Sequence, residues 1–481
     1  MKKTQKFAWI MGMLVSALLS QPSIALAAEK GSSENIGATL PLGFCLPFAG
    51  MLLCIAVCPL LAERWWEKKK PYVVAFWSIA FILPFAFYAG FGEAAEQVLE
   101  VIFGDYITFI VLLFGLFCVA GNICLEGDLV GTPKLNALLL LIGTFLSSWI
   151  GTTGASMVMI RPLLRANKWR HRKVQVVVFF IFLVSNIGGC LTPVGDPPLL
   201  MGFTNGIDFF WSMKLLPILL LNVVLLLGLF FVLDTRAYRK DIADGAKKPD
   251  VSENKAPLRL TGAHNIIFLV MIVGAVILSG VLPKEVPFFA KHLHIYGGVE
   301  MEVSAIFEVV VILIAALLSF KTTKKEIREK NNFTWDAIQE VAILFIGIFI
   351  TMIPALLILK SKGSALGVEE PWQFFWITGC LSSFLDNTPT YLVFFTTAAS
   401  LGFTEGVKTA LGYIDEIVLM AISCGAVFMG AVTYIGNAPN FMVRSIAEEN
   451  GIKMPSFFSY LFWSISCLVP VFLIDMLLFF I

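Results

Sequence analysis

The chain alternates between long apolar stretches and short polar or charged segments. About ten of the apolar stretches are close to 20 residues long, the length that an α-helix needs to cross a bilayer. They lie at 42–62, 72–90, 107–125, 174–192, 212–233, 264–283, 304–320, 338–360, 414–434 and 456–479. Two further stretches, 137–165 and 372–400, carry polar residues in their middle, which favours a pair of short half-helices in each. The pattern predicts an all-α polytopic membrane protein with about ten transmembrane helices.

The composition supports a membrane protein and excludes two other classes. Of the 481 residues, 58% are hydrophobic and only 14% are charged, whereas about a quarter of an ordinary soluble domain is charged. The net charge is +1, and Lys and Arg occur in short clusters between the apolar stretches. A nucleic-acid-binding protein would instead carry a basic face. We therefore expect a lipid bilayer as the environment and no nucleic-acid partner.

The N-terminal segment has the pattern of a secretory signal peptide. Lys2, Lys3 and Lys6 precede an apolar run at 7–19, and small residues follow at 25–27. This predicts a bacterial signal peptide at 1–27 and a multi-pass protein of the inner membrane. The alternative is a first helix that is not cleaved. In both cases the residues at 29–37 would lie outside the cytoplasm.

The basic clusters constrain how the apolar stretches cross the membrane. The clusters lie at 63–70, 161–173, 235–260 and 321–330, and positive segments stay in the cytoplasm. All four can do so only if 137–165 enters the membrane and returns to the same side, and the count then places 372–400 as a hairpin from the opposite side. Both stretches are thus predicted to be re-entrant hairpins. The polar segment 235–260 is predicted to be a flexible cytoplasmic linker.

Three sequence blocks of the first half recur in the second half in the same order. They pair 113–117 with 345–349, 146–153 with 381–388, and 189–198 with 430–439, at offsets of 232, 235 and 241 residues. The first copy begins outside and the second inside, so the repeats are inverted, as in many secondary transporters. The predicted divisions are 28–106 with two helices, 107–234 as the first repeat, the linker, 261–337 with connecting helices, and 338–481 as the second repeat.

The third block predicts a broken helix in each repeat. Gly and Pro interrupt a helix and free backbone groups, which a membrane tolerates only where the backbone is buried in protein or lines a wet cavity. Such helix ends coordinate ions in transporters. The predicted ion and substrate site consists of Ser148, Thr152, Thr153, Asn186, Thr192, Gly195, Asp196, Asp386, Asn387, Thr388, Thr433, Gly436 and Asn437. The alternative is that the breaks are only kinks with locally satisfied Ser and Thr.

Asp196 and Asp386 are carboxylates at membrane depth. Such a group is costly and is by default a candidate functional residue. A cation that competes with a proton for one carboxylate is the simplest exchange mechanism, so sodium is predicted at Asp386 and Asp196, with sodium and protons as the transported or coupling ions and no other cofactor. The alternative is a structural carboxylate that caps a half-helix. The nine cysteines lie in apolar stretches without metal-ligand or disulfide spacing and are expected to be core residues.

At these motifs the chain resembles the ion-transporter superfamily. The motifs are SNIGGCLTPVGDPP at 185–198, SSFLDNTPT at 382–390 and GAVTYIGNAPN at 430–440. The superfamily includes NhaD-type sodium/proton antiporters, arsenite and dicarboxylate permeases, and bacterial citrate transporters. The resemblance covers about residues 40–480 and implies that hairpin tips and broken helices form the substrate and sodium sites. It also implies a scaffold part, a transport part that moves against it, and a homodimer.

The resemblance leaves the substrate open. The motif at 382–390 and Asp196 are similar to the antiporter pattern, but Gly151 stands where those antiporters carry a second Asp. A sodium- or proton-coupled citrate or dicarboxylate transporter would use the same site. A third reading is an intramembrane aspartyl protease with Asp196 and Asp386 as its dyad, which does not need the duplicated breaks. The chain has no HExxH, Walker A or nucleophile-elbow motif, so an enzyme is not expected.

Overall fold

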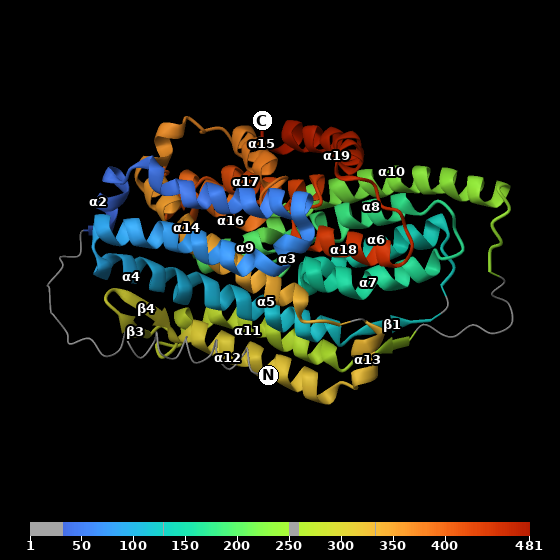
Figure 1. The fold of residues 1–481 in the computed structure, drawn as a ribbon, viewed down its shortest axis with the longest axis horizontal. Helices are drawn as coiled ribbons and strands as arrows, with labels where there is room; N and C mark the ends of the chain where they lie inside the picture. The colour runs from blue at the N-terminus through green and yellow to red at the C-terminus, as the bar shows by residue number, and fades with distance from the viewer. Residues whose placement is uncertain (1–31, 128, 250–258, 332) are drawn as a thin grey trace.

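The structure is a computed structural model that describes residues 32–127, 129–249, 259–331 and 333–481. The expected signal peptide at 1–27 lies outside the described residues, as does part of the linker at 250–258. Ten helices among the described residues are long and apolar enough to cross a membrane. They lie nearly parallel to the long axis of the molecule (Figure 1). Nine of them correspond to expected spans and the tenth is Pro133–Ile150, which was expected to be half of a hairpin, whereas the expected span 414–434 is the shorter helix Glu416–Val432. The chain is therefore an all-α polytopic membrane protein, as the sequence predicted.

The N-terminal helices differ from the prediction in their ends. The expected spans 42–62 and 72–90 are confirmed as two helical segments, Leu42–Pro59 and Arg64–Ala89, which meet at a kink at Ala62 within α3 and pack against each other. Residues 64–70 already belong to the second segment. The next helix begins at Phe91 and not at 107, because α4, a π-helical turn and α5 continue into one another. The elements are α2 (Ser32–Thr39), η1 (Leu42–Cys45), α3 (Leu46–Ala89), α4 (Phe91–Glu100), η2 (Val101–Tyr106) and α5 (Ile107–Gly121).

The elements of the first half recur in the second half in the same order. A hairpin of two helices follows a long helix, and then comes a helix broken by a non-helical segment. The first set is α5, α6 (Pro133–Ile150), α7 (Thr152–Ala166), α8 (Val174–Leu183), η3 (Ile187–Leu191), α9 (Pro197–Thr204), η4 (Trp211–Leu215) and α10 (Leu216–Ala243). The second is α14 (Asp336–Lys362), η5 (Gly363–Leu366), α15 (Pro371–Ser382), α16 (Asn387–Ala399), α17 (Glu416–Met429), η6 (Gly430–Val432), α18 (Ala438–Glu449) and α19 (Phe457–Phe479).

Three helices lie between these sets, and three small antiparallel strand pairs accompany the helices. The sequence did not predict the strands, which are only three to five residues long. The helices are α11 (Asn265–Glu285), α12 (Val303–Thr322) and the short α13 (Lys325–Lys330). The antiparallel pairs are β1 (Cys124–Glu126) with β2 (Arg259–Thr261), β3 (His292–Tyr296) with β4 (Val299–Glu302), and β5 (Val407–Thr409) with β6 (Gly412–Ile414).

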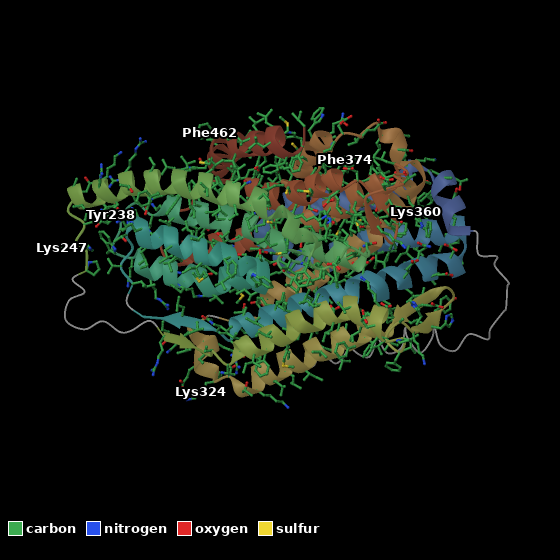
Figure 2. All side chains as sticks on the ribbon, turned by 180° about the vertical axis from the view of Figure 1, so that it is seen from behind. Tyr238, Lys247, Lys324, Lys360, Phe374 and Phe462 are labelled. Atoms are coloured by element: carbon green, nitrogen blue, oxygen red, sulfur yellow. The ribbon has the colours of Figure 1, made fainter. Side chains whose placement is uncertain are left out.

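The basic clusters gather at one end of the molecule, which we call the basic end. Lys330 pairs with Glu126 at 2.7 Å, and Lys70 pairs with Glu340 near the start of α14 at 2.9 Å. Figure 2 shows Lys247 and Lys324 toward this end and Lys360 toward the other. The predicted linker is not wholly a loop, since α10 continues to Ala243 and residues 259–261 form β2.

The two hairpins point toward each other from opposite ends. The amide N of Gly131 donates to the carbonyl O of Ala166 at 2.7 Å, so both ends of α6–α7 lie together at the basic end. Hairpin α15–α16 approaches from the opposite end, and the two tips meet near the middle of the molecule (Figure 1). Between them runs α8 with η3, where 94% of the residues are buried. A helix that is apolar on all sides is expected at such a central place.

Candidate ion and substrate site

Four helices begin at the centre of the molecule, two at hairpin tips and two after helix breaks. The residues at their N-cap positions are Gly151 before α7, Asp196 before α9, Asp386 before α16 and Asn437 before α18. Gly151 and Asp386 occupy matching places of the two repeats, and so do Asp196 and Asn437. The N-terminus of a helix carries unpaired amide groups and a partial positive charge. The fold thus collects four polar helix ends at the places that the repeat blocks predicted.

Asp196 is the centre of the hydrogen bonds at this place. Its side chain is buried, with 1% of the residue exposed. The Thr152 hydroxyl donates to Oδ1 at 3.0 Å, the Asn387 amide donates to Oδ2 at 2.5 Å, and the Asn437 amide lies 3.4 Å from Oδ1. Both hairpin tips and the second break therefore reach one carboxylate on the first break.

Asparagine side chains connect the two broken helices. The Asn437 amide also donates to Oδ1 of Asn186 at 3.2 Å, and the Asn186 amide donates to Oδ1 of Asn440 at 2.7 Å. Asn440 in turn donates to the carbonyl oxygens of Gly430 and Thr433 at 2.8 and 2.9 Å. The prediction omitted Asn440. Its signal was a polar residue just after Pro439, but the matching position in the first repeat is Leu199, so the repeat did not mark it.

Matching hydroxyl groups attach each break to its own hairpin. Thr192 donates to the carbonyl oxygen of Ser148, and Thr433 donates to that of Ser383. One residue earlier in each hairpin, Ser147 donates to Val184 O and Ser382 to Ala426 O, both at 2.6 Å. The Ser148 hydroxyl likewise donates to the carbonyl oxygen of Gly188. The hydroxyl hydrogens of Thr192, Thr433 and Ser148 are therefore bonded to the backbone and are not available to donate to a ligand. The sequence missed Ser147, Ser382 and Ser383, although all three lie in the matched second block.

The predicted glycines of the breaks are places of close backbone contact. A Cβ atom on Gly195 would lie 2.2 Å from the carbonyl oxygen of Gly189, and one on Gly436 would lie 2.6 Å from that of Gly430. The Gly195 carbonyl also accepts from the Thr152 amide N at 2.9 Å. Only glycine lets the broken segment fold back against the 3-10 turn that precedes it.

The other residues of the second tip have more local roles. Asp386 is half-buried and caps its own helix, since Oδ1 accepts from the Thr388 amide N at 3.1 Å. The Thr388 hydroxyl lies 3.5 Å from Oδ1 of Asn387. Among the described residues, Thr153 is half-buried and makes no hydrogen bond with its side chain to the site. Asp196, in contrast, lies at an N-cap position but makes no capping hydrogen bond to α9. The alternative hypothesis of a carboxylate that caps a half-helix therefore applies to Asp386 and not to Asp196.

The chemistry of the ligand atoms suits a hard monovalent cation better than a transition metal. Among the described residues there is no group of three His, Cys, Asp or Glu that could hold a metal ion. The site offers one carboxylate, amide oxygens, hydroxyls and backbone carbonyls, which are oxygen ligands. None of the ion pairs in the described parts of the chain includes Asp196 or Asp386. A bound cation would therefore supply the positive counter-charge that no described Lys, Arg or His supplies to Asp196.

The arrangement does not form an aspartyl-protease dyad. Such a dyad needs two carboxyl groups within hydrogen-bond reach. Both oxygens of Asp196 are occupied by Thr152, Asn387 and Asn437, and Asp386 is bonded to the start of α16. Within the described residues the two carboxylates share no hydrogen bond.

Ten spans, opposed hairpins and broken helices around one buried carboxylate define a secondary membrane transporter. The chain matches the family model described as "Putative citrate transport" over residues 37–480, and it belongs to that family. No curated protein matches the chain. The expected class, a multi-pass membrane transporter of the superfamily that includes citrate permeases, is confirmed.

Proposed function

We propose that the protein exchanges a monovalent cation, sodium or lithium, for protons, with Asp196 as the exchanging carboxylate. The supporting observation is that both hairpin tips and the second helix break converge on Asp196, which has no basic partner among the described ion pairs. A buried carboxylate needs either a proton or a cation to offset its charge. Competition of the two for Asp196 couples their movements.

The neighbouring side chains would complete the cation's shell. Rotation of the Asn387 and Asn437 amides presents their oxygens where their nitrogens now donate. When a proton binds, the amides return to donating to the carboxyl group. Because the hairpins of the two repeats come from opposite ends of the molecule, movement of the two repeats against the remaining helices exposes Asp196 to one side at a time.

A second candidate is citrate transport coupled to sodium or protons, and the family description favours it. The four helix N-termini would attract an anion. Against it stand the negative charges of Asp196 and Asp386 and the lack of a described Lys or Arg in contact with them. A citrate anion would then need a bound cation or a protonated Asp196 beside it.

The test uses inside-out vesicles from a bacterial strain without its own sodium antiporters. The vesicles hold an acid interior that a quenched dye reports, and sodium or lithium is added. We expect fluorescence recovery with the wild type and none with Asp196→Asn. Asp386→Asn should retain part of the exchange, because an amide still caps α16. The matched control is Asp415→Asn, which changes another capping Asp, at the start of α17, and should exchange like the wild type.

Full exchange by the Asp196→Asn protein, at equal amounts in the membrane, would overturn the proposal. If the wild type shows no recovery, labelled citrate uptake with and without sodium follows. Sodium-dependent citrate uptake would then establish the second candidate in its place.

A further inference from the structure

Two carboxylates outside the site occupy matching positions of the repeats. Asp234 in α10 and Asp475 in α19 are 241 residues apart, the same offset as the two helix breaks. Both residues have an exposed fraction of 0%. They differ in what surrounds them, and the difference points to a function for Asp475.

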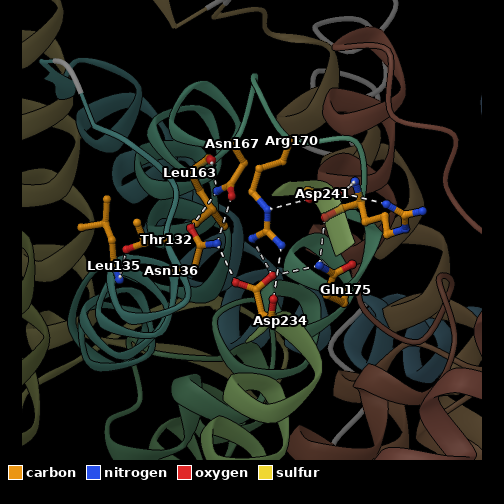
Figure 3. Close-up of polar contacts among 10 residues, drawn as sticks. Thr132, Leu135, Asn136, Leu163, Asn167, Arg170, Gln175, Asp234 and Asp241 are labelled. Carbon is orange, nitrogen blue, oxygen red and sulfur yellow. Dashed lines mark hydrogen bonds and ion pairs between the residues drawn. The ribbon is translucent and has the colours of Figure 1, made fainter. Parts of the chain in front are cut away.

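The charge of Asp234 is neutralised by a dense polar network (Figure 3). Arg170 donates to Oδ1 of Asp234 at 2.6 Å and to Oδ2 of Asp241 at 3.1 Å. Gln175 and Asn136 donate to Asp234 at 2.9 and 3.0 Å. This network joins α6, the turn before α8 and α10. Because the charges of this network are paired and hydrogen-bonded, we interpret its role as structural.

Asp475 carries the same carboxylate, but no described Arg or Lys pairs with it. Its oxygens accept from the single amide nitrogen of Asn222 at 2.9 and 2.8 Å. At the same offset of 241 residues the counterpart of Arg170 is Leu411, and no ion pair among the described residues includes Asp475. In addition, Oδ1 of Asn222 is buried without a hydrogen-bond partner.

We propose that Asp475 binds and releases a proton and is a second proton-exchange site of the transporter. If the Asn222 amide turns so that its unpaired oxygen faces the carboxyl group, a carboxyl O–H donates to that oxygen. The bound proton also removes a buried charge that has no counter-charge. When the proton leaves for water, the Asn222 amide nitrogen donates to the carboxylate formed. No other reactant is needed.

Asp475 lies near the 3-10 turn that precedes the first helix break. Cys190, in that turn, lies within electrostatic range of both Asp196 and Asp475. The Cys424 thiol of α17 interacts with Asp475 and with Cys190. These two thiols are the titratable groups that face Asp475 from the described elements packed around it. The same 3-10 turn therefore lies near both carboxylates. The inference rests on the proposed cation/proton exchange and adds a second proton to it.

The test measures protons released when sodium binds to the purified protein in detergent, with a pH-indicator dye and a parallel sodium-binding measurement. We expect Asp475→Asn to bind sodium but to release about half as many protons per sodium as the wild type. Asn is close to Asp in shape and can still bond Asn222. The control is Glu308→Gln, which removes another buried carboxyl group, one held by Ser279 in the pair α11–α12. It should leave the proton count unchanged.

Equal proton release by wild type and Asp475→Asn would overturn this inference and leave the exchange at Asp196 intact. Absence of sodium binding in the wild type would overturn the proposed function instead. Infrared difference spectra over pH decide the protonation of Asp475 in either case, since the signal of a protonated carboxyl group must disappear in Asp475→Asn. If that variant does not fold, Asn222→Ala keeps the carboxyl group and removes its donor. Its proton release should then move to higher pH, and an unchanged pH dependence would contradict the proposal.

Discussion

At the scale of single residues, the two central carboxylates have separate roles although both occupy N-cap positions. Asp386 uses an oxygen to accept from the Thr388 amide, whereas Asp196 accepts only from side chains of other elements. A capping carboxylate stabilises its own helix by about 1 kcal/mol. Asp196 instead accepts hydrogen bonds from three other elements and so connects them. Binding of a proton or a cation to Asp196 therefore changes the hydrogen bonds of both hairpin tips.

The break glycines give a residue-scale prediction. Gly195→Ala should lower the free energy of unfolding by about 1–3 kcal/mol, because the added methyl group meets a carbonyl oxygen that belongs to the backbone and cannot rotate away. Gly436→Ala should act in the same direction and somewhat less, as its clash with the Gly430 oxygen is at 2.6 Å and not at 2.2 Å. Thermal unfolding in detergent, followed by tryptophan fluorescence, measures both.

Gly228→Ala is the control for these two variants. Gly228 lies inside α10 with no atom within 4 Å of an added Cβ, so alanine should stabilise the helix by up to about 1 kcal/mol. Equal unfolding temperatures for Gly195→Ala and Gly228→Ala would contradict the close contact at the break.

At the scale of elements, the repeated blocks of the sequence predicted the helix breaks, whereas a position whose residue type is not repeated was missed. The duplicated Gly-x-x-Thr-x-x-Gly blocks predicted both breaks and placed Thr192 and Thr433 correctly within them. Asn440 has Leu199 as its repeat partner and was missed. Helix ends were wrong where polar residues continue a helix beyond the membrane, as at Phe91 and at 235–243. There the last turns are held by packing and by buried contacts of Asp241, which no local pattern reveals.

The asymmetry between the hairpins gives a prediction at this scale. Hairpin α6–α7 is fixed to α10 through Asn136 and Arg170, whereas no ion pair among the described residues joins α15–α16 to α19. Arg170→Met should therefore cost about 3–5 kcal/mol of stability, because it leaves buried charges on Asp234 and Asp241 with fewer partners. Unfolding by heat at constant pH measures this loss.

An exposed ion pair serves as the control. Lys325→Met removes the pair with Glu329 on α13, where the two side chains are 81% and 61% exposed, and it should change stability by less than about 1 kcal/mol. A cost for Arg170→Met no larger than for Lys325→Met would show that the network does not hold the hairpin.

At the scale of the whole molecule, a bound cation ties together elements from both halves of the chain. Asp196 belongs to the first repeat, and two of its three donors belong to the second. A ligand bound there must be lost before the repeats can separate, so binding stabilises the folded molecule as a unit. The stabilisation follows from mass action and reaches about 2.7 kcal/mol when the ligand is at 100 times its dissociation constant.

We therefore expect sodium or lithium, but not choline at equal ionic strength, to raise the unfolding temperature of the purified protein. Because the cation and the proton compete for Asp196, the rise should be larger at high pH than at low pH. Asp196→Asn should remove it, and Asp415→Asn, at a distant helix start, should retain it. A rise caused by citrate alone, independent of sodium and retained in Asp196→Asn, would contradict a cation-centred site. It would place the anion at the helix N-termini instead, so this one measurement separates the two candidate functions by the charge of the ligand that the site holds.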